Sequence, residues 1–145
     1  MKTNKETLPI ELLDQIQSRG AGYDLLRYVS LPDLFGNEAE ALLYFMGRNL
    51  ARKFEINALS DIIYFFEKVG WGRLELFKEK NNQLEFHLLS DAVVQRLAMP
   101  VDVEFRLEAG FLAEAITILK GKECECIEEV RKKIHQVEFT IIFVE

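Results

Sequence analysis

The segment from Phe105 to Gly121 constrains the fold more than any other part of the sequence. It reads as one helix with two apolar stripes and a row of small residues between them. One stripe is Phe105, Ala109, Leu112, Ile116 and Leu119, the other is Leu107, Phe111 and Ile118, and Gly110, Ala113 and Thr117 lie between. Neither face can be turned to water, so we expect this helix between a sheet and a second layer. That layer is either another part of the chain or a second subunit.

Gly110 is the most informative position in this helix. A glycine inside a helix costs about 1 kcal/mol relative to alanine, so close packing against a neighbour is the expected compensation. Gly110, Phe111 and Ala113, together with Trp71, are our candidates for the lining of an apolar pocket. Trp71 itself is interpreted either as a lid on the core or as a platform for a ligand.

A second clear helix is predicted from Asn37 to Phe54. Asn37 and Glu40 have the spacing of a capping box, and the core stripe is Ala39, Leu43, Met46, Leu50 and Phe54. Gly47 and Ala51 would let another backbone come close, and Phe45 lies on the opposite side of the helix. We therefore take Phe45, Gly47 and Ala51 as candidates for a dimer interface.

The remaining elements follow from periodicity and turn signals. We expect a short helix at 8–17, a turn-rich connector at 23–35, a helix at 58–69 that stops at Gly70, strands at 71–80 and 83–89, a short helix at 90–97, an irregular strand at 122–130 and a central last strand at 137–144. A three-residue hairpin loop with Asn82 left-handed would place Leu76 opposite Phe86, on the face that both should share.

Composition limits the function classes. The 145 residues are 49% apolar and 29% charged, which fits one globular domain over residues 1–145. A net charge of -6 argues against nucleic acid, since the one dense basic cluster is 131–133. No run of 18 apolar residues occurs, so we expect neither a membrane span nor secretion. Cys124 and Cys126 suggest reduced thiols in a cytoplasm.

Three strings in this order are characteristic of a known family. They are LPDLFGNEAEALLYFMGRNLARKF at 31–54, FFEKVGWGRLEL at 65–76 and FRLEAGFLAEAI at 105–116. Together they resemble the YslB-like proteins of Gram-positive bacteria, which in turn resemble four-vinyl-reductase-type domains, TRAPP core subunits and haem-based nitric-oxide sensors. This resemblance implies an α+β fold with N-terminal helices, a small antiparallel sheet of about four strands and a buried glycine-bearing helix. It also implies dimerisation through helices.

The chemistry of those relatives does not transfer in full. Haem sensors need a histidine on a helix, whereas His87 lies on the predicted hairpin and His135 near the final turn. Cys124 and Cys126 lack further ligands at zinc-site spacing, so we interpret them as structural thiols and expect no metal and no cofactor. The acidic residues Glu108, Glu114, Glu128 and Glu129 are interpreted as solvated rather than catalytic.

Our leading hypothesis is a non-enzymatic homodimer that acts as a binding or scaffold protein and holds an apolar small molecule beside Gly110. The alternative is a sensor of a lipid-like or tetrapyrrole-like molecule that regulates a protein partner. An enzyme that uses the thiols or the acidic residues is a third hypothesis.

Overall fold

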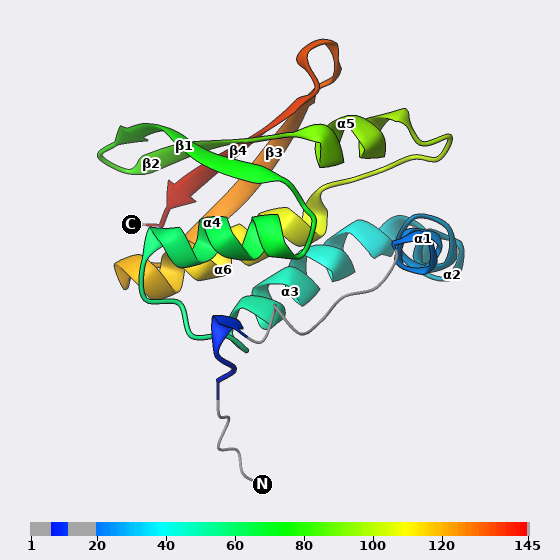
Figure 1. Cartoon of the computed structure of the whole chain (residues 1–145). Helices are drawn as coiled ribbons and strands as arrows, with labels where there is room; N and C mark the ends of the chain where they lie inside the picture. The colour runs from blue at the N-terminus through cyan, green and yellow to red at the C-terminus, as the bar shows by residue number, and fades with distance from the viewer. Residues whose placement is uncertain (1–6, 12–19, 145) are drawn as a thin grey trace, which may run out of the picture.

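The computed structural model describes residues 7–11 and 20–144, so most of the helix predicted at 8–17 lies outside the described residues. The chain folds into helices and one sheet (Figure 1). In order, the elements are α1 (Ala21–Leu25), η2 (Leu26–Ser30), α2 (Leu31–Phe35), η3 (Gly36–Glu38), α3 (Ala39–Ala51), α4 (Leu59–Lys68), β1 (Arg73–Lys80), β2 (Gln83–Leu89), α5 (Asp91–Ala98), α6 (Arg106–Lys120), β3 (Cys124–Arg131), η4 (Lys132–Ile134) and β4 (Gln136–Phe143).

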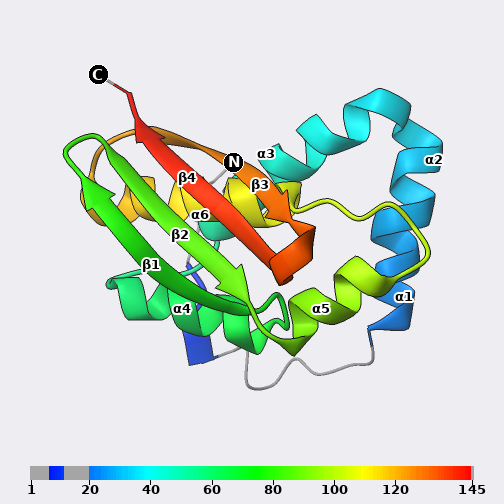
Figure 2. The same ribbon diagram turned by 90° about the horizontal axis from the view of Figure 1, so that it is seen from above.

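The sheet has four antiparallel strands in the order β1-β2-β4-β3, so the last strand is central, as predicted. Residues alternate between two faces along each strand. In β4 the inner face carries Val137, Phe139, Ile141 and Phe143, all of them buried. Figure 2 shows α4 and α6 behind the strands, while no helix of the described residues crosses their front. The sheet therefore has one face in the core and one outer face.

The predicted sandwiching of the Phe105–Gly121 segment is confirmed. Every residue of α6 from Leu107 to Ile116 is buried. One side of α6 packs on the sheet, and α3 packs on α6 from the side away from the sheet (Figure 1). The second layer is thus α3 of the same chain.

Two glycines allow α3 and α6 to approach closely. A Cβ atom on Gly47 would collide with the Leu107 carbonyl oxygen and lie 2.7 Å from the Phe111 nitrogen. A Cβ atom on Gly110 would collide with the carbonyl oxygen of Tyr44. Gly47 faces α6 and Ala51 is fully buried, so neither can reach a second copy, which corrects their assignment to a dimer interface.

The N-terminal connector differs from expectation. Residues 23–35 are helical rather than turn-rich, and they form α1, η2 and α2. The capping box predicted at Asn37 and Glu40 is also wrong, because Asn37 lies in the short η3 helix and α3 begins at Ala39 without a side-chain cap. The turn-forming residues Pro32 and Gly36 fit into this arrangement since Pro32 lies in the first turn of α2, and Gly36 follows its end with a φ of 58°.

The hairpin keeps the predicted pairing by a different route. Leu76 lies opposite Phe86, as predicted, but the turn has only the two residues 81 and 82, because Lys80 pairs with Gln83. The extra residue is Phe77, which forms a bulge between Leu76 and Lys78. Asn82 does not have the predicted left-handed conformation, since Ser90 and His135 are the non-glycine residues with positive φ in the described part of the chain.

Candidate binding surface

The space beside Phe111, where we expected an apolar pocket, is filled by aromatic rings. Phe111 stacks on Phe65 with ring centroids 4.1 Å apart, and the centroids of Phe66 and Trp71 lie 5.9 Å and 5.6 Å from it. Ala113 is fully buried, and Gly110 lies against the α3 backbone. These four candidate residues are therefore part of a packed core, in which Trp71 is buried against Phe65, Phe66 and Phe111.

Exposed apolar side chains gather instead on the N-terminal helices. We call this set the α1–α3 apolar surface; it consists of Leu25, Leu26, Val29, Leu34, Phe35, Leu42, Phe45 and Met46. Leu34 is 74% exposed and Phe45 is 65% exposed. Leu42, Phe45 and Met46 have the helical spacing that places them on one face of α3, the face opposite Gly47. Phe45 lies on the side of α3 away from the core, as predicted, whereas Met46, predicted in the core stripe, is 49% exposed.

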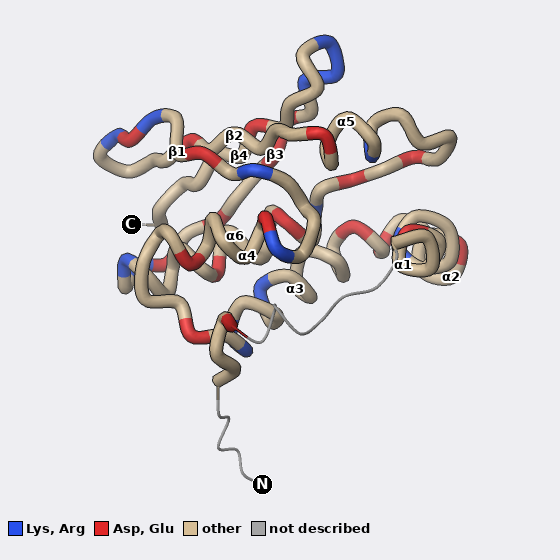
Figure 3. Tube along the Cα trace, in the orientation of Figure 1, with Lys and Arg blue, Asp and Glu red and all other residues tan. Residues whose placement is uncertain are grey.

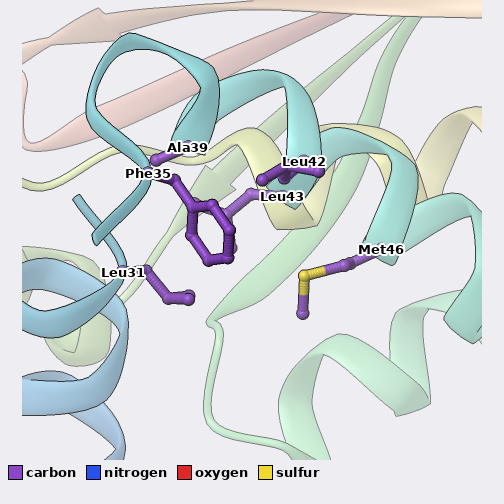
Figure 4. Close-up of a pocket in the computed structure, with 6 residues that line it drawn as sticks. All are labelled: Leu31, Phe35, Ala39, Leu42, Leu43 and Met46. Atoms are coloured by element: carbon purple, nitrogen blue, oxygen red, sulfur yellow. The ribbon is translucent and has the colours of Figure 1, made fainter. Parts of the chain in front are cut away.

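This surface contains an apolar pocket of about 160 Å³. Figure 4 shows its lining, which comes from α2 and α3: Leu31, Phe35, Ala39, Leu42, Leu43 and Met46. Ala39 and Leu43 form the buried floor, while Phe35, Leu42 and Met46 belong to the exposed α1–α3 apolar surface. A second apolar concavity of about 150 Å³ lies where α4 and α6 meet the β1–β2 hairpin, with Leu59, Leu84 and Leu119 in its lining.

The helices that carry the surface are held to α6 by a buried ion pair. α1 has no buried residue, and η2 buries only Arg27 and Tyr28. The Arg27 guanidinium donates hydrogen bonds to both carboxylate oxygens of Glu108, at 2.6 and 2.9 Å, and to both of Glu104, at 2.9 Å. These bidentate contacts fix η2 to the start of α6.

A second arginine completes this cluster. Arg96 of α5 donates two hydrogen bonds to the Tyr28 hydroxyl, and its Nη1 lies 2.9 Å from Glu108 Oε2 in an ion pair whose geometry is not that of a hydrogen bond. Burial by itself raises the pKa of Glu108, but the charges of Arg27 and Arg96 outweigh burial and lower that pKa to about 2. Glu108 is thus a buried, ionised structural group, not the solvated one predicted.

A further polar cluster joins α3, α6 and β3. Arg48 donates to Glu114 at 3.0 Å and to the backbone oxygen of Cys124 at 3.1 Å. The Tyr44 hydroxyl donates to Glu125 at 2.5 Å and accepts the backbone N–H of Cys126 at 3.1 Å. Burial, followed by the bond to Glu125, raises the pKa of Tyr44 to about 12.

The four acidic residues taken as solvated occupy different environments. Glu114 is buried against Arg48, and Glu128 is partly buried beside Arg106 at 2.7 Å, whereas Glu129 is exposed. The outcome corrects the expectation for Glu108 and Glu114. Both carboxylates are held by arginines, so each is already occupied by a structural contact.

Both cysteines lie in the core and are free. Burial raises the pKa of Cys124 and raises that of Cys126 well above its ordinary value. The Cys124 thiol lies 3.2 Å from the Ala113 carbonyl oxygen, to which it donates. These environments are those of structural thiols.

Charge is interspersed over the surface rather than gathered in a stripe (Figure 3). The basic cluster at 131–133 lies at the tip of the β3–β4 connection, where Arg131 pairs with Glu129 and Glu138. Among the described residues, no helix has both the length and the apolar character required to cross a bilayer.

Comparison with known proteins agrees with this architecture. The family described as "Protein of unknown function (DUF2507)" matches residues 20–142. The uncharacterized protein YslB of Bacillus subtilis (strain 168) is 35% identical over 132 residues, which cover 91% of this chain and 89% of YslB. The uncharacterized protein MJ1642 of Methanocaldococcus jannaschii is 25% identical over 107 residues, 73% of this chain and 65% of that protein. The match therefore spans less than two thirds of MJ1642.

Two solved structures are similar in fold. A vinyl-4-reductase family protein from Methanocaldococcus jannaschii has a TM-score of 0.71 at 17% identity, with 94% of this chain and 88% of that chain covered. The phenol-responsive sensory domain of the transcription activator PoxR, solved with phenol, has a TM-score of 0.64 at 18% identity, with 88% and 76% covered. These likenesses confirm the predicted α+β fold and the resemblance to four-vinyl-reductase-type domains at the level of fold.

Proposed function

The chain belongs to the DUF2507 family, and on that premise we propose that it is a non-enzymatic binding protein that pairs with a second copy of itself through the α1–α3 apolar surface. The observation that carries the proposal is the outward apolar face of α3, formed by Leu42, Phe45 and Met46, next to the exposed side chains of α1, η2 and α2. Large apolar side chains that gather on the exposed faces of neighbouring helices often mark interaction sites.

The shape of the surface favours a second copy as the occupant. Phe45 projects from α3, and the pocket of about 160 Å³ opens on the same surface between α2 and α3. In a two-fold dimer the same patch faces itself, so each Phe45 ring can enter the other copy's pocket. A cavity of about 150 Å³ is large enough for benzene, and the phenyl ring of Phe45 has the size of benzene.

The polar surroundings of the patch fit an interface rim. Asp24, Asp33, Glu38 and Glu40 lie on the same helices, and Glu38 and Glu40 are exposed. An apolar centre with a charged edge is the usual anatomy of a protein interface. Such a dimer would present two sheets for other partners. A cytoplasmic location, in which Cys124 and Cys126 stay reduced, belongs to the same proposal.

The test is the mass of the full-length chain in solution, measured by sedimentation over a wide range of concentrations. We expect a dimer, and we expect Phe45→Glu to shift it to a monomer because the carboxylate would be buried without a partner. Ile134→Glu is the matched control, since Ile134 is 62% exposed in η4, outside the proposed interface. A monomeric native chain, or a Phe45→Glu variant that still dimerises, would reject the proposal.

A second candidate function is a small-molecule sensor. It is supported by the same apolar pocket and by the fold likeness to a sensory domain solved with phenol. Phenol itself is a suitable probe, measured by calorimetry and by native mass spectrometry of the purified protein. If the pocket serves a ligand, phenol binds and Leu42→Trp, which fills the pocket, removes that binding. If the pocket serves dimerisation, the native spectrum shows two chains without extra mass.

A further inference from the structure

The outer face of the sheet carries a row of acidic residues around one histidine. The strand register places Glu75, His87, Glu138 and Glu129 next to one another across β1, β2, β4 and β3. Glu85 lies two residues before His87 and therefore points to the same face. This arrangement is independent of the α1–α3 apolar surface and of the proposed dimer.

Three of these side chains converge. One potential ligand atom from each of Glu85, His87 and Glu138 lies within 4.8 Å of the other two, and His87 Nε2 is 2.9 Å from Glu85 Oε2. The three side chains are only 29%, 13% and 22% exposed, although no helix of the described residues covers this face. Their positions are thus more sheltered than those of ordinary surface acids.

The imidazole is held in place from two other directions. The Phe77 ring, which lies at the bulge in β1, stacks on His87 with centroids 4.1 Å apart and an interplanar angle of 19°. The side-chain amide of Gln136 lies 3.3 Å from His87 Nδ1. Histidines that bind metals are usually oriented in this way, by a hydrogen bond at the ring nitrogen that does not touch the metal.

We propose that His87 Nε2 and one carboxylate oxygen each from Glu85 and Glu138 bind a divalent transition-metal ion. An imidazole nitrogen favours Zn²⁺ and similar ions over Mg²⁺ and Ca²⁺, which prefer oxygen alone. Two carboxylates balance the ion's two positive charges, and three protein ligands leave a fourth position for water. The neutral ring then carries its proton on Nδ1, where the amide oxygen of Gln136 accepts it once that amide is turned over.

Arg131 competes with the metal for Glu138. Its Nε lies 3.2 Å from Glu138 Oε2 and its Nη2 lies 3.3 Å from Oε1. The Arg131 side chain is 47% exposed, so this pair is weak and can open. Arg131 also pairs with Glu129 at 3.3 Å, and that pair can remain when the metal takes Glu138. Removal of the Arg131 charge should therefore strengthen metal binding.

The experiment is calorimetric titration of Zn²⁺ into the full-length chain without an affinity tag, at constant pH. We expect one site, no comparable binding of Mg²⁺, and loss of the binding heat in His87→Ala. His135→Ala is the matched control, because His135 is exposed in the η4 turn and should leave the titration unchanged. Gln136→Leu should weaken binding by about 10-fold or more, as for other groups that orient a ligand.

The Arg131→Gln variant should bind Zn²⁺ more tightly than the native chain. Because unfolding can only weaken binding, this variant distinguishes a true metal site from an effect of misfolding. Circular dichroism checks that each variant is folded. If His87→Ala does not fold, Glu138→Gln takes its place as the variant that lacks a metal ligand. Absence of binding heat overturns the proposal. So does Zn²⁺ binding that survives in a folded His87→Ala variant, which would point to Cys124 and Cys126, or weaker binding by Arg131→Gln.

Discussion

Gly47 of α3 and Gly110 of α6 meet at one helix crossing, where each lies against the backbone of the other's helix. Gly110 has the Tyr44 carbonyl group above its Cα atom, and Gly47 has the Leu107 carbonyl oxygen and the Phe111 nitrogen. Neither neighbour is the flexible end of a side chain, so neither can move aside cheaply. The crossing therefore sets the distance between the two helices.

Gly110→Ala should destabilise the protein even though alanine is the better helix former. The gain in helix propensity is about 1 kcal/mol, whereas overpacking costs about 1–3 kcal/mol, and the Tyr44 backbone that the new methyl group would meet places the cost toward the upper end. At this chain length a net loss of about 1–2 kcal/mol lowers the melting temperature by roughly 2–8 °C. Gly47→Ala should act in the same direction, and thermal unfolding followed by circular dichroism measures both.

Gly22→Ala is the matched control for this prediction. Gly22 lies in α1, and an added Cβ atom would meet nothing within 4 Å. The same substitution should therefore be neutral or stabilise by up to about 1 kcal/mol. If Gly110→Ala melts at or above the native temperature, close helix packing is not what maintains a glycine there.

The sequence predicted this crossing in part. Glycines inside two apolar helices indicate close approach at both positions, and that was correct for Gly47 and Gly110. The pattern could not tell which backbone fills the space, because a helix of the same chain and one of a second copy require the same small residue. The interface was therefore assigned to the wrong face of α3, and only Phe45 remains a candidate.

Arg27→Met should destabilise the chain strongly. It leaves Glu108 buried with Arg96 as its remaining ion-pair partner, and breaking a buried pair by removing one side costs about 3–5 kcal/mol. Urea unfolding measures the change. Arg73→Met is the matched control, because the Arg73–Glu75 pair is exposed and should contribute less than about 1 kcal/mol. Equal losses of unfolding free energy in the two variants would contradict a special role for Arg27.

The Arg27–Glu108 pair also shows what the sequence could not supply. The two residues are 81 positions apart, and Glu108 lies among apolar residues of α6 that predict burial. A charged residue in such a stretch is normally taken as solvated unless its partner is known. Here the partner comes from a segment, 23–35, that the sequence indicated as a turn-rich connector. Because residues 23–35 were predicted to be turn-rich rather than helical, the partner of Glu108 was missed and Glu108 was predicted to be solvated.

The same limit applies to the sheet. His87 and Glu138 are neighbours because β2 and β4 pair, although their sequence spacing matches no metal motif. Glu85 and His87 are two residues apart, so the strand period places both on one face, but it supplies only two of the three proposed metal ligands. The third comes from strand order and register, which local patterns do not encode.

Acid should unfold the protein partly through Glu108. Its pKa is near 2 in the folded chain and 4.5 when unperturbed. Because the folded pKa is the lower one, this group's contribution is complete above about pH 5 and is lost as the pH falls toward 2. Glu108→Gln should therefore show a shallower loss of stability over that range than the native chain, measured by urea unfolding at each pH. Parallel curves for the two proteins would contradict this assignment.

The two cysteine thiols should react slowly in the folded chain, as expected of thiols buried in a core. Cys124 and Cys126 are buried and have raised pKa values, so few thiolates form and reagents cannot reach them. We expect almost no reaction of the native chain with a disulfide reagent at mildly alkaline pH. Two thiols should react after unfolding in urea. Rapid modification of one thiol in the folded chain would show that β3 opens.

Tyr44→Phe should loosen β3, which is an edge strand of the sheet. The Tyr44 hydroxyl accepts the backbone N–H of Cys126, a donor that β4 does not use, and so covers part of an edge that would otherwise be open. Loss of the hydroxyl leaves that buried N–H without its partner, at a cost of about 1–3 kcal/mol. Hydrogen exchange should accelerate at the Cys126 amide far more than at Phe139 in the central strand β4. Equal acceleration at both amides would mean that the whole protein is destabilised and that the hydroxyl does not act on the edge.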